Sequence, residues 1–524
     1  MNKIAKKVFA LTTLLALSTN IVACGGGTGG GGYVGDLDPG FWENLAETVE
    51  GDGNNGGNGN DQTGDIVING DPTKVPAYDG SKVTITFYHT MGQMLREVLD
   101  AWIPEFNAMY PNIKIEHQSQ GGYPDLRDAI STELNGGNSP NIAYCYPDHV
   151  ALYNKAGAVA TLDDYIASTA IVKHNDGTEE TMGFSQAQVN EFVRGYYEEG
   201  RAYGDGLMYT LPYSKSTEVL YYNKTFFEEH DLEVPTTWDE METLLQQIVE
   251  IDPNCTPLGY DSEANWFITM CEQLGTPYTS ATPVNGSRFL FDVPQNNAFV
   301  ERLRTWYQLR LVTTEETYGS YTSDLFTQTD PNEDKSYMTI GSSAGASYQC
   351  PDKFMNENNE EAYPFEVGVA LPPQIDPDNP KVISQGPSLC MFKKANKQEM
   401  AATWLFMKFL TSNELLQANF SATSGYAPVI KNLDQKNEAY KDILESADGN
   451  GNLQSSCVKQ CLAQENFMFV SPAFLGSSGA RDQVGILMQN CFVNAPSANQ
   501  TNAEFVKAEF EAILEKLRYD YERN

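Results

Sequence analysis

Residues 82–119 contain a strand, a helix and a second strand in immediate succession, and this order restricts the fold more than any other feature of the chain. In "KVTITFYHT" (82–90) apolar side chains alternate with polar ones, which is typical of a half-buried strand. The following "GQMLREVLDAWIPEFNAMYP" carries its apolar residues at helical spacing, and Pro111 ends it before the strand-like "IKIEHQS". Two parallel strands joined by a right-handed crossover are therefore predicted.

The same alternation of strands and helices continues along the chain. "NIAYCYP" and "TEVLYYNK" predict strands, and "TTWDEMETLLQQIVEID" predicts a helix that Thr236 or Thr237 caps. "SYMTIGSSAG" and "FEVGVALPP" predict further strands, and helices dominate from "KQEMAATWLFMKFLTS" onward. The class is α/β without internal repeats, and the roughly 440 residues after position 80 are enough for two domains.

The first 23 residues resemble a secretion signal. Lys3, Lys6 and Lys7 precede an apolar stretch that is too short and too polar to span a bilayer. This stretch ends at "IVAC", which resembles the lipobox of bacterial lipoproteins. Cys24 is therefore expected to carry the lipid that holds the protein on the extracellular face of the cytoplasmic membrane. The alternative is an ordinary signal followed by a chance cysteine.

Residues 24–80 are rich in Gly, Asn and Asp, as in "GDGNNGGNGNDQTGD". Such a composition buries too little apolar surface to fold, so a flexible tether is predicted. The short "FWENLAETVE" within it is interpreted as a transient helix.

The chain is strongly acidic, with 34 basic and 70 acidic residues and a net charge of −36. This balance argues against nucleic acid and against anionic membrane surfaces as partners. It does not identify a ligand, because the local charges of a site decide what it binds.

Eight cysteines remain besides Cys24, and the sequence leaves their state open. An even number outside the cell permits disulfides of unknown connectivity, and free buried thiols are the other possibility. Cys457 and Cys461 are spaced CxxxC, which is neither a redox CxxC nor a zinc pair with a partner. No metal or cofactor is predicted.

"GSSAG" (341–345) fits G-x-S-x-G and follows an apolar strand, so a serine hydrolase needs consideration. In α/β-hydrolases the triad histidine follows the serine in chain order, but all five histidines precede Ser343. Pro212 stands where an S-x-x-K pair with Lys215 would need a serine, and HExxH, Walker A and GxGxxG motifs are absent from the sequence. No enzyme is predicted, although a carboxylate pair among 70 acids stays open.

"LPYSKSTEVLYYNK" (211–224) allows three interpretations, namely a catalyst, a set of ligand donors, or a polar turn before a strand. Together with the following "TFFEEHDLEVPTTWDE" it resembles the family 1 extracellular solute-binding proteins of bacterial ABC importers. "ITFYHTMGQMLREVLDAWIPEFNAMYPNIKI", "MTIGSSAG", "SQGPSL" and "SGYAPV" add matches in the same order. The resemblance covers most of residues 81–524 and leaves the tether unmatched.

The resemblance implies a two-lobed, type II periplasmic-binding-protein-like fold with hinge strands between the lobes and a ligand cleft. The expected N-terminal lobe comprises 81–185 plus 335–395, and the C-terminal lobe 186–334 plus 396–524. The implied partners are ABC permease subunits, a cytoplasmic ATPase and a small polar solute, and a monomer is expected.

Within the family the chain looks most like the branch that binds glycerol 3-phosphate or glycerophosphodiesters. Positions carried over from that branch imply two ligand tyrosines, two ligand serines, a backbone contact, an arginine and an aromatic floor. These are Tyr123, Tyr426, Ser216, Ser342, Gly386, Arg481 and Trp266. An arginine fork with hydroxyl and N–H donors suits a phosphate, and each of these residues has an alternative role in packing, turns or ion pairs.

The chain departs from the family pattern after the second predicted strand, where Tyr146 replaces a glutamate and Asp148 follows two places later. Lys215 also occupies a position that is usually small. It is interpreted either as a cation that favours an anionic ligand or as a solvated surface lysine. Rival functions are a secreted serine hydrolase or glycosidase, and a surface adhesin or sensory co-receptor on the same fold.

Overall fold

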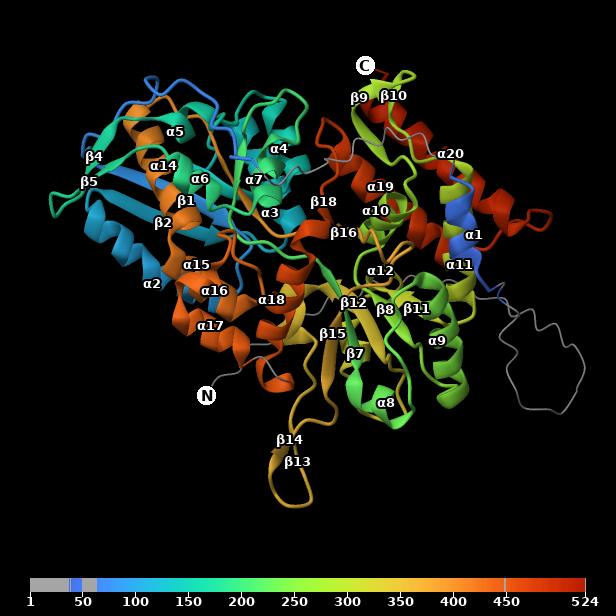
Figure 1. Cartoon of the computed structure of the whole chain (residues 1–524). Coiled ribbons are helices and arrows are strands. Elements are labelled where there is room, and N and C mark those ends of the chain that lie inside the picture. The colour runs from blue at the N-terminus through green and yellow to red at the C-terminus, as the bar shows by residue number, and fades with distance from the viewer. Residues whose placement is uncertain (1–36, 38, 50–63, 447–448, 524) are drawn as a thin grey trace, which may run out of the picture. The chain divides into compact units, whose positions relative to one another are not determined.

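The computed structural model describes residues 37, 39–49, 64–446 and 449–523. The predicted signal and Cys24 lie outside these residues, so the lipid anchor stays a prediction. Two five-stranded sheets organise the described part (Figure 1). Each sheet, with the helices that cover it, is called a lobe below, the first lobe being the one that contains residues 83–89.

The first sheet has the strand order β2-β1-β3-β17-β6. β1 is parallel to β2 and β3, which confirms the β-α-β prediction for 82–119, and β17 runs antiparallel to β3 and β6. The bounds in this lobe are β1 (Val83–His89), α2 (Gln93–Met109), β2 (Ile113–Ser119), α3 (Tyr123–Gly136), β3 (Ile142–Cys145), α4 (Pro147–Asn154), β6 (Thr210–Pro212), β17 (Ser388–Met391), α14 (Lys397–Ser412) and α15 (Glu414–Ser424).

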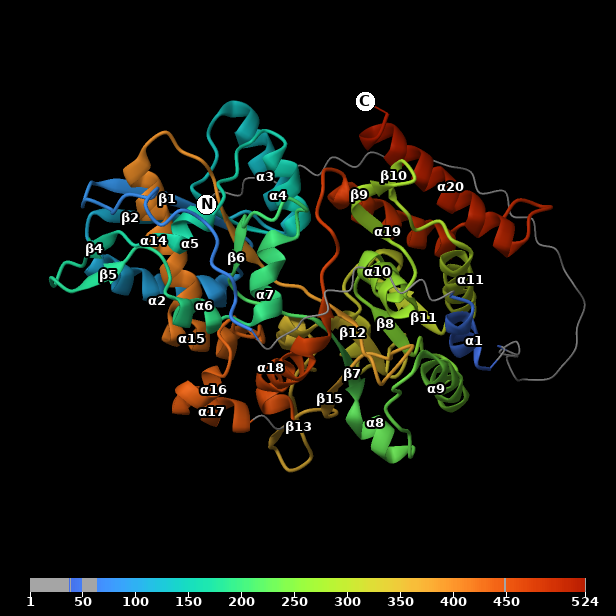
Figure 2. The same ribbon diagram turned by 45° about the horizontal axis from the view of Figure 1, so that its top comes forward.

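The second sheet has the order β11-β8-β12-β7-β15, in which β7 is antiparallel to β12 and β15 while β11, β8 and β12 are parallel. α19 packs against α10 and α20 beside this sheet (Figure 2). The bounds are β7 (Glu218–Asn223), α9 (Trp238–Ile251), β8 (Leu258–Tyr260), α10 (Glu263–Leu274), α11 (Pro294–Gln308), β11 (Val312–Thr314), β12 (Met338–Ser342), β15 (Val367–Ala370), α18 (Leu453–Gln464), α19 (Ser477–Val493) and α20 (Asn502–Tyr521).

Shorter elements complete the fold. Within the described residues, every helix is too short or too polar to cross a membrane. The shorter helices are α1 (Phe41–Glu47), α5 (Asp163–Ala167), α6 (Gln186–Asn190), α7 (Arg194–Glu198), η1 (Glu199–Arg201), α8 (Lys224–Glu229), α12 (Glu315–Tyr318), α13 (Ser323–Phe326), η2 (Ser343–Tyr348), α16 (Leu433–Lys436), α17 (Glu438–Glu445), η3 (Asn450–Asn452) and η4 (Glu465–Phe467). The two-stranded pairs are β4 (Ile171–Lys173) with β5 (Glu179–Thr181), β9 (Thr279–Val284) with β10 (Ser287–Phe289), β13 (Phe354–Met355) with β14 (Glu361–Ala362), and β16 (Val382–Ile383) with β18 (Met468–Phe469).

Strand pairing corrects the predicted lobe boundaries. Residues 338–370, expected in the first lobe, supply β12 and β15 to the second sheet. β6 and the helices at 397–424, expected in the second lobe, belong with the first sheet. A local pattern identifies a strand but not its partners, and β12 inserts between β8 and β7, which precede it by many residues.

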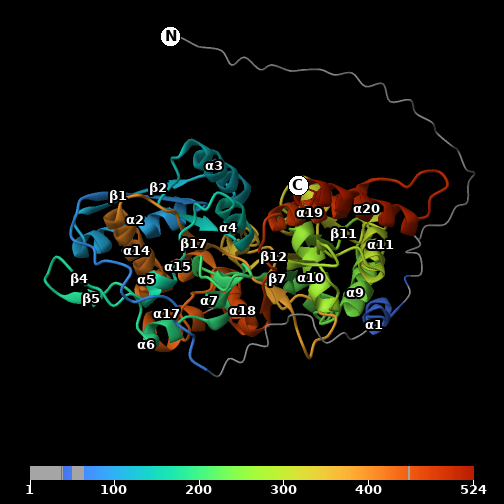
Figure 3. The same cartoon turned by 90° about the horizontal axis from the view of Figure 1, so that it is seen from above.

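The predicted tether (24–80) is also wrong in part. Ile66, Val75 and Tyr78 are buried in the hydrophobic core of the first lobe. The expected transient helix is α1, whose Trp42 is buried against α9 and α11 of the second lobe (Figure 3). A few apolar residues with distant partners therefore order segments that are mostly polar.

Three short segments meet between the lobes and are called the hinge segments: 213–217, 383–387 and 425–427. The first joins β6 to β7, and the second leads into β17. Lys215 and Ala427 exchange backbone hydrogen bonds of 3.1 and 2.6 Å, and Ser216 and Gln385 exchange bonds of 3.0 and 2.8 Å. "LPYSKSTEVLYYNK" is thus a strand, a hinge segment and a second strand.

Candidate ligand-binding site

A pocket lined by both polar and apolar residues lies where the two lobes and the hinge segments meet. Its volume of about 40 Å³ is far below the roughly 300–1,000 Å³ of typical ligand pockets. To enclose a solute, the walls must therefore separate. The lining residues are Tyr146, Pro147, Asp148, Glu199, Ile268, Tyr278, Ile383, Ser384, Val470, Ser471, Pro472, Ser477 and Arg481.

The first-lobe wall is the turn from β3 into α4. Tyr146 is the N-cap residue, Pro147 fills the first helical position, and Asp148 places a carboxylate in the first turn, where the helix dipole favours it. The ring of Tyr123, at the start of α3, lies 4.4 Å from that of Tyr146. Among the described residues, its buried hydroxyl has no hydrogen-bond partner. Burial raises the pKa of both tyrosines, so they act as neutral hydroxyls.

The second-lobe wall is the first part of α19, which carries Arg481. A Cβ at Gly479 would lie 2.5 Å from the Tyr521 hydroxyl, so this glycine lets α20 pack closely on α19. Arg481 is half-buried and donates to the side-chain carbonyl of Asn265. Within the described part of the chain, no carboxylate forms an ion pair with it. Arg481 is therefore a cation in the pocket whose charge lacks a paired anion.

A contact between the lobes lies next to Arg481. Arg127 of α3 donates to the Ser478 hydroxyl at 3.1 Å and pairs with the Asp482 carboxylate at 3.2 Å. These two residues flank the turn of α19 that presents Arg481. The first lobe thus contributes directly to fixing α19.

Glu218, at the start of β7, is a buried carboxyl behind the pocket wall. The hydroxyl of Tyr260 donates to it at 2.6 Å. Burial raises its pKa to about 7, while Tyr260, Asn265 and Arg481 act in the opposite direction. Its ionisation is therefore sensitive to pH near neutrality.

We expect Glu218 to make stability fall as pH rises. Its folded-state pKa of about 7 exceeds the ordinary 4.5, so between these values the unfolded chain ionises first. The free energy of unfolding that depends on protonated Glu218 is therefore fully present below about pH 4.5 and lost above about pH 7. The difference between these two limits is roughly 3 kcal/mol. Urea unfolding at pH 5 and pH 7.5 should show a smaller loss in Glu218→Gln than in the wild type.

Glu250→Gln, at an exposed position of α9, is the matched control for this test. Glu315, whose pKa burial also raises to about 7, keeps its own contribution in both proteins. Equal pH dependence in the wild type and Glu218→Gln would show that Glu218 is ionised throughout this range.

The hinge segments approach too closely for any residue but glycine at position 386. Gly386 has φ +87°, and a Cβ there would lie 2.5 Å from the carbonyl oxygen of Ser214. Below it, the Lys215 ammonium lies 2.6 Å from the Glu199 carboxylate, and both side chains are buried. The Ser384 hydroxyl donates to the same carboxylate at 3.1 Å. Lys215 is therefore neither a solvated surface lysine nor a cation available to an anionic ligand, because Glu199 neutralises its charge inside the hinge.

The other expected site residues lie in different surroundings. Ser216 is buried and contributes its backbone to the hinge pairing, and Ser342 caps η2 by accepting from the Ala344 N–H at 3.2 Å. Trp266 is fully buried in the second lobe with its ring 4.5 Å from that of Tyr260, so we assign it to the core in place of the cleft floor. Tyr426 is half-buried in the third hinge segment.

Four residues that the sequence did not single out belong to this region: Glu199, Tyr278, Ser384 and Glu218. Tyr278 lines the pocket with a buried hydroxyl that has no hydrogen-bond partner in the described part of the chain. Glu199 lies in η1, far from any motif, and only its contact with Lys215 marks it. Glu218 begins the quoted "EVLYYNK", where its position directly after the hinge is the available signal.

The nucleophile candidate is built into the hinge. Ser343 is fully buried, its N–H donates to the Thr217 carbonyl at 2.8 Å, and its hydroxyl accepts from the Thr217 N–H at 3.4 Å. The eight described cysteines are free thiols, so of the two possibilities, disulfides or free thiols, the structure shows the second. The described residues contain no cluster of three or more ligating side chains that could hold a metal.

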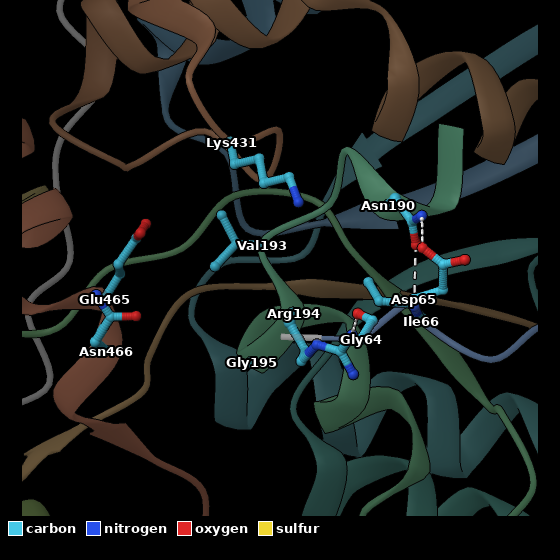
Figure 4. Close-up of a pocket in the computed structure, with 10 residues that line it drawn as sticks. All are labelled: Gly64, Asp65, Ile66, Asn190, Val193, Arg194, Gly195, Lys431, Glu465 and Asn466. Carbon is cyan, nitrogen blue, oxygen red and sulfur yellow. Dashed lines mark hydrogen bonds between the residues drawn. The ribbon is translucent and has the colours of Figure 1, made fainter. Parts of the chain in front are cut away.

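A second cavity of about 290 Å³ is lined by residues 64–66, 190, 193–195, 431 and 465–466, none of which is an expected ligand residue (Figure 4). Some of its polar groups pair with one another. Asn190 donates to the Asp65 carboxylate at 2.7 Å and accepts from the Ile66 N–H at 2.9 Å, and Arg194 donates to the Gly64 carbonyl. These contacts attach the segment that begins at Gly64 to the first lobe.

A family model described as bacterial extracellular solute-binding protein matches residues 101–445. The chain belongs to this family. Its members are substrate-binding components of ABC importers and not enzymes, so neither the hydrolase nor the sensory alternative is supported.

Among curated relatives, the sn-glycerol-3-phosphate-binding periplasmic protein UgpB of Escherichia coli K12 is 25% identical over 364 residues, which is 66% of this chain and 74% of that protein. Solved structures show the same fold. UgpB of Mycobacterium tuberculosis, in complex with glycerophosphocholine, has 15% identity and a TM-score of 0.61, over 83% of this chain and 98% of that one. The cyclic alpha-maltosyl-1,6-maltose binding protein of Arthrobacter globiformis has 16% identity and a TM-score of 0.61, over 84% of this chain and 100% of that one. The two-lobed α/β prediction is confirmed.

Proposed function

We propose that this solute-binding protein captures a small polar solute with an anionic group, a glycerol 3-phosphate or glycerophosphodiester ahead of a neutral sugar. The observation that carries the proposal is Arg481, which lines the pocket between the lobes without an ion-pair partner in the described residues. A guanidinium binds a phosphate through two parallel hydrogen bonds, and the partially buried setting strengthens them. The name of the E. coli relative agrees with this class of ligand.

In the proposed complex the remaining polar groups hold the rest of the solute. The hydroxyls of Tyr123 and Tyr278 are buried without hydrogen-bond partners in the residues that the structure describes, and they supply donors and acceptors. Tyr146 supplies an aromatic surface for C–H groups and Asp148 a carboxylate for hydroxyls. Tyr426 closes the aromatic wall from the hinge.

The neutral sugar is the second candidate, and the tyrosines favour it because carbohydrate binding needs aromatic faces and few charges. In either case we propose delivery of the solute to ABC permease subunits whose cytoplasmic ATPase supplies the energy. We further propose a monomer tethered by a lipid on Cys24 to the extracellular face of the membrane. The Cys-containing "IVAC" supports this proposal.

A thermal-shift titration of the mature chain separates the candidate ligands. We expect sn-glycerol 3-phosphate or glycerophosphocholine to raise Tm in a saturable way, because a ligand that binds only the folded state stabilises it by mass action. Maltose and xylo-oligosaccharides serve as the neutral comparison at equal concentration. Stabilisation by the neutral sugars alone would exclude the phosphate proposal.

A further inference from the structure

α1 lies beside α9 and α11 of the second lobe (Figure 3). Its residues contact Trp238 and Asp239 of α9 and Arg302 and Trp306 of α11. Trp42 is 1% exposed, and its ring centroid lies 5.6 Å from that of Trp306 and 6.1 Å from that of Trp238. Leu45, one helical turn later, is 8% exposed. The buried face of α1 is therefore anchored by a tryptophan between two tryptophans.

Polar contacts hold both ends of α1 against α9 and α11. The Asp239 carboxylate accepts from the backbone N–H groups of Trp42 at 3.2 Å and Glu43 at 3.0 Å, which caps the free N–H groups of the first turn. The Arg302 guanidinium lies 4.7 Å from the centroid of the Phe41 ring. At the other end, the side-chain amide of Gln295 donates to the Thr48 carbonyl at 3.1 Å.

α9 and α11 are joined to each other by contacts that do not involve α1. Glu242 of α9 accepts from the Trp306 indole N–H at 2.6 Å and pairs with Arg302, which joins α9 to α11. By contrast, an isolated helix of seven residues is far below the length that is stable in water. The packing on α9 and α11 thus stabilises α1 as a helix, whereas α9 and α11 pack together without α1.

We propose that α1 is a docking helix that fixes the point at which the N-terminal segment leaves the folded body to the second lobe. The contacts of α1 with α9 and α11 carry this proposal, and it holds whether or not Cys24 carries a lipid.

Two measurements on the mature chain with Cys24→Ser test the docking. In a Cys350→Ser background, cysteines introduced at Thr28 and at the exposed Glu250 carry a donor and an acceptor for energy transfer. Trp42→Ala is expected to lower the transfer efficiency at least about twofold. Loss of a buried tryptophan should also speed amide exchange in α1 about 100-fold or more. Glu47→Ala, on the exposed face of α1, is the matched control and should change neither readout.

Unchanged exchange in β1 and β12 shows that the Trp42→Ala body is folded. Equal transfer and equal α1 exchange in the wild type and Trp42→Ala would overturn the proposal. Transfer between separately labelled molecules that falls on dilution would also overturn it, because α1 would then dock on a second copy. Neither readout involves a solute, so a failure here is distinguishable from a failure of the proposed function.

Discussion

Replacing Lys215 by Met is expected to lower the free energy of unfolding by about 3–5 kcal/mol. The variant leaves the Glu199 carboxylate buried with the Ser384 hydroxyl as its one remaining side-chain partner among the described residues. A buried charge that loses its counter-ion keeps its full desolvation penalty, and this loss exceeds what an exposed ion pair contributes. Urea unfolding at pH 7 measures the difference.

A second variant separates the charge from the packing. Lys215→Met combined with Glu199→Gln removes both charges and keeps an amide that can accept from Ser384, so stability should return to within about 2 kcal/mol of the wild type. Lys353→Met, which breaks an exposed pair with Glu361, is the matched control and should cost less than about 1 kcal/mol. A Lys215→Met variant as stable as this control would refute the role assigned to the pair.

The local pattern of the sequence was sufficient for the elements and insufficient for their partners. Alternation at 82–90 and helical spacing after it identified β1 and α2, since both depend on which face each residue presents. The lobe boundaries failed because β12 and β15 pair with β7, a contact between segments more than a hundred residues apart. Pairing of that kind leaves no periodic signal in either segment.

The tether prediction failed for a related reason. Composition averages over a window, so the many glycines and asparagines of 24–80 outweighed Trp42 and Tyr78. Each of these aromatic residues is ordered by a surface supplied from elsewhere, Trp42 by α9 and α11. One tryptophan in a polar segment is thus a better sign of docking than the composition around it.

The residues of the candidate site were predicted from the family resemblance more than from the chemistry of their side chains. Tyr146, Asp148 and Arg481 line one pocket, and the ring of Tyr123 packs at a tilt against that of Tyr146. Trp266 could not be distinguished from a cleft residue, because a buried indole in a core and one in a cleft have the same sequence signal. Lys215 was misread because its partner lies in a short helix that no motif marks.

Arg481→Ala is expected to weaken the binding of sn-glycerol 3-phosphate at least about 100-fold, or about 3 kcal/mol. The guanidinium is the pocket's cation without a paired anion among the described residues, so its removal leaves the phosphate charge uncompensated in a partially buried site. Arg481→Lys should recover part of the affinity, because an ammonium supplies the charge without the planar fork.

Lys436→Ala is the matched control, since that lysine is a cation of the first lobe already paired with Glu191 and Glu414. It should bind the phosphate ligand as the wild type does. Unchanged Tm values would confirm that Arg481→Ala and the control are folded.

Calorimetric titration of the wild type and Arg481→Ala with sn-glycerol 3-phosphate and with glycerol tests whether Arg481 binds the phosphate group. We expect saturable binding of sn-glycerol 3-phosphate by the wild type, a loss of at least about 100-fold in Arg481→Ala, and much weaker binding of glycerol by both proteins. Equal affinities of the wild type for the two ligands, or equal phosphate affinities of the wild type and Arg481→Ala, would contradict this expectation.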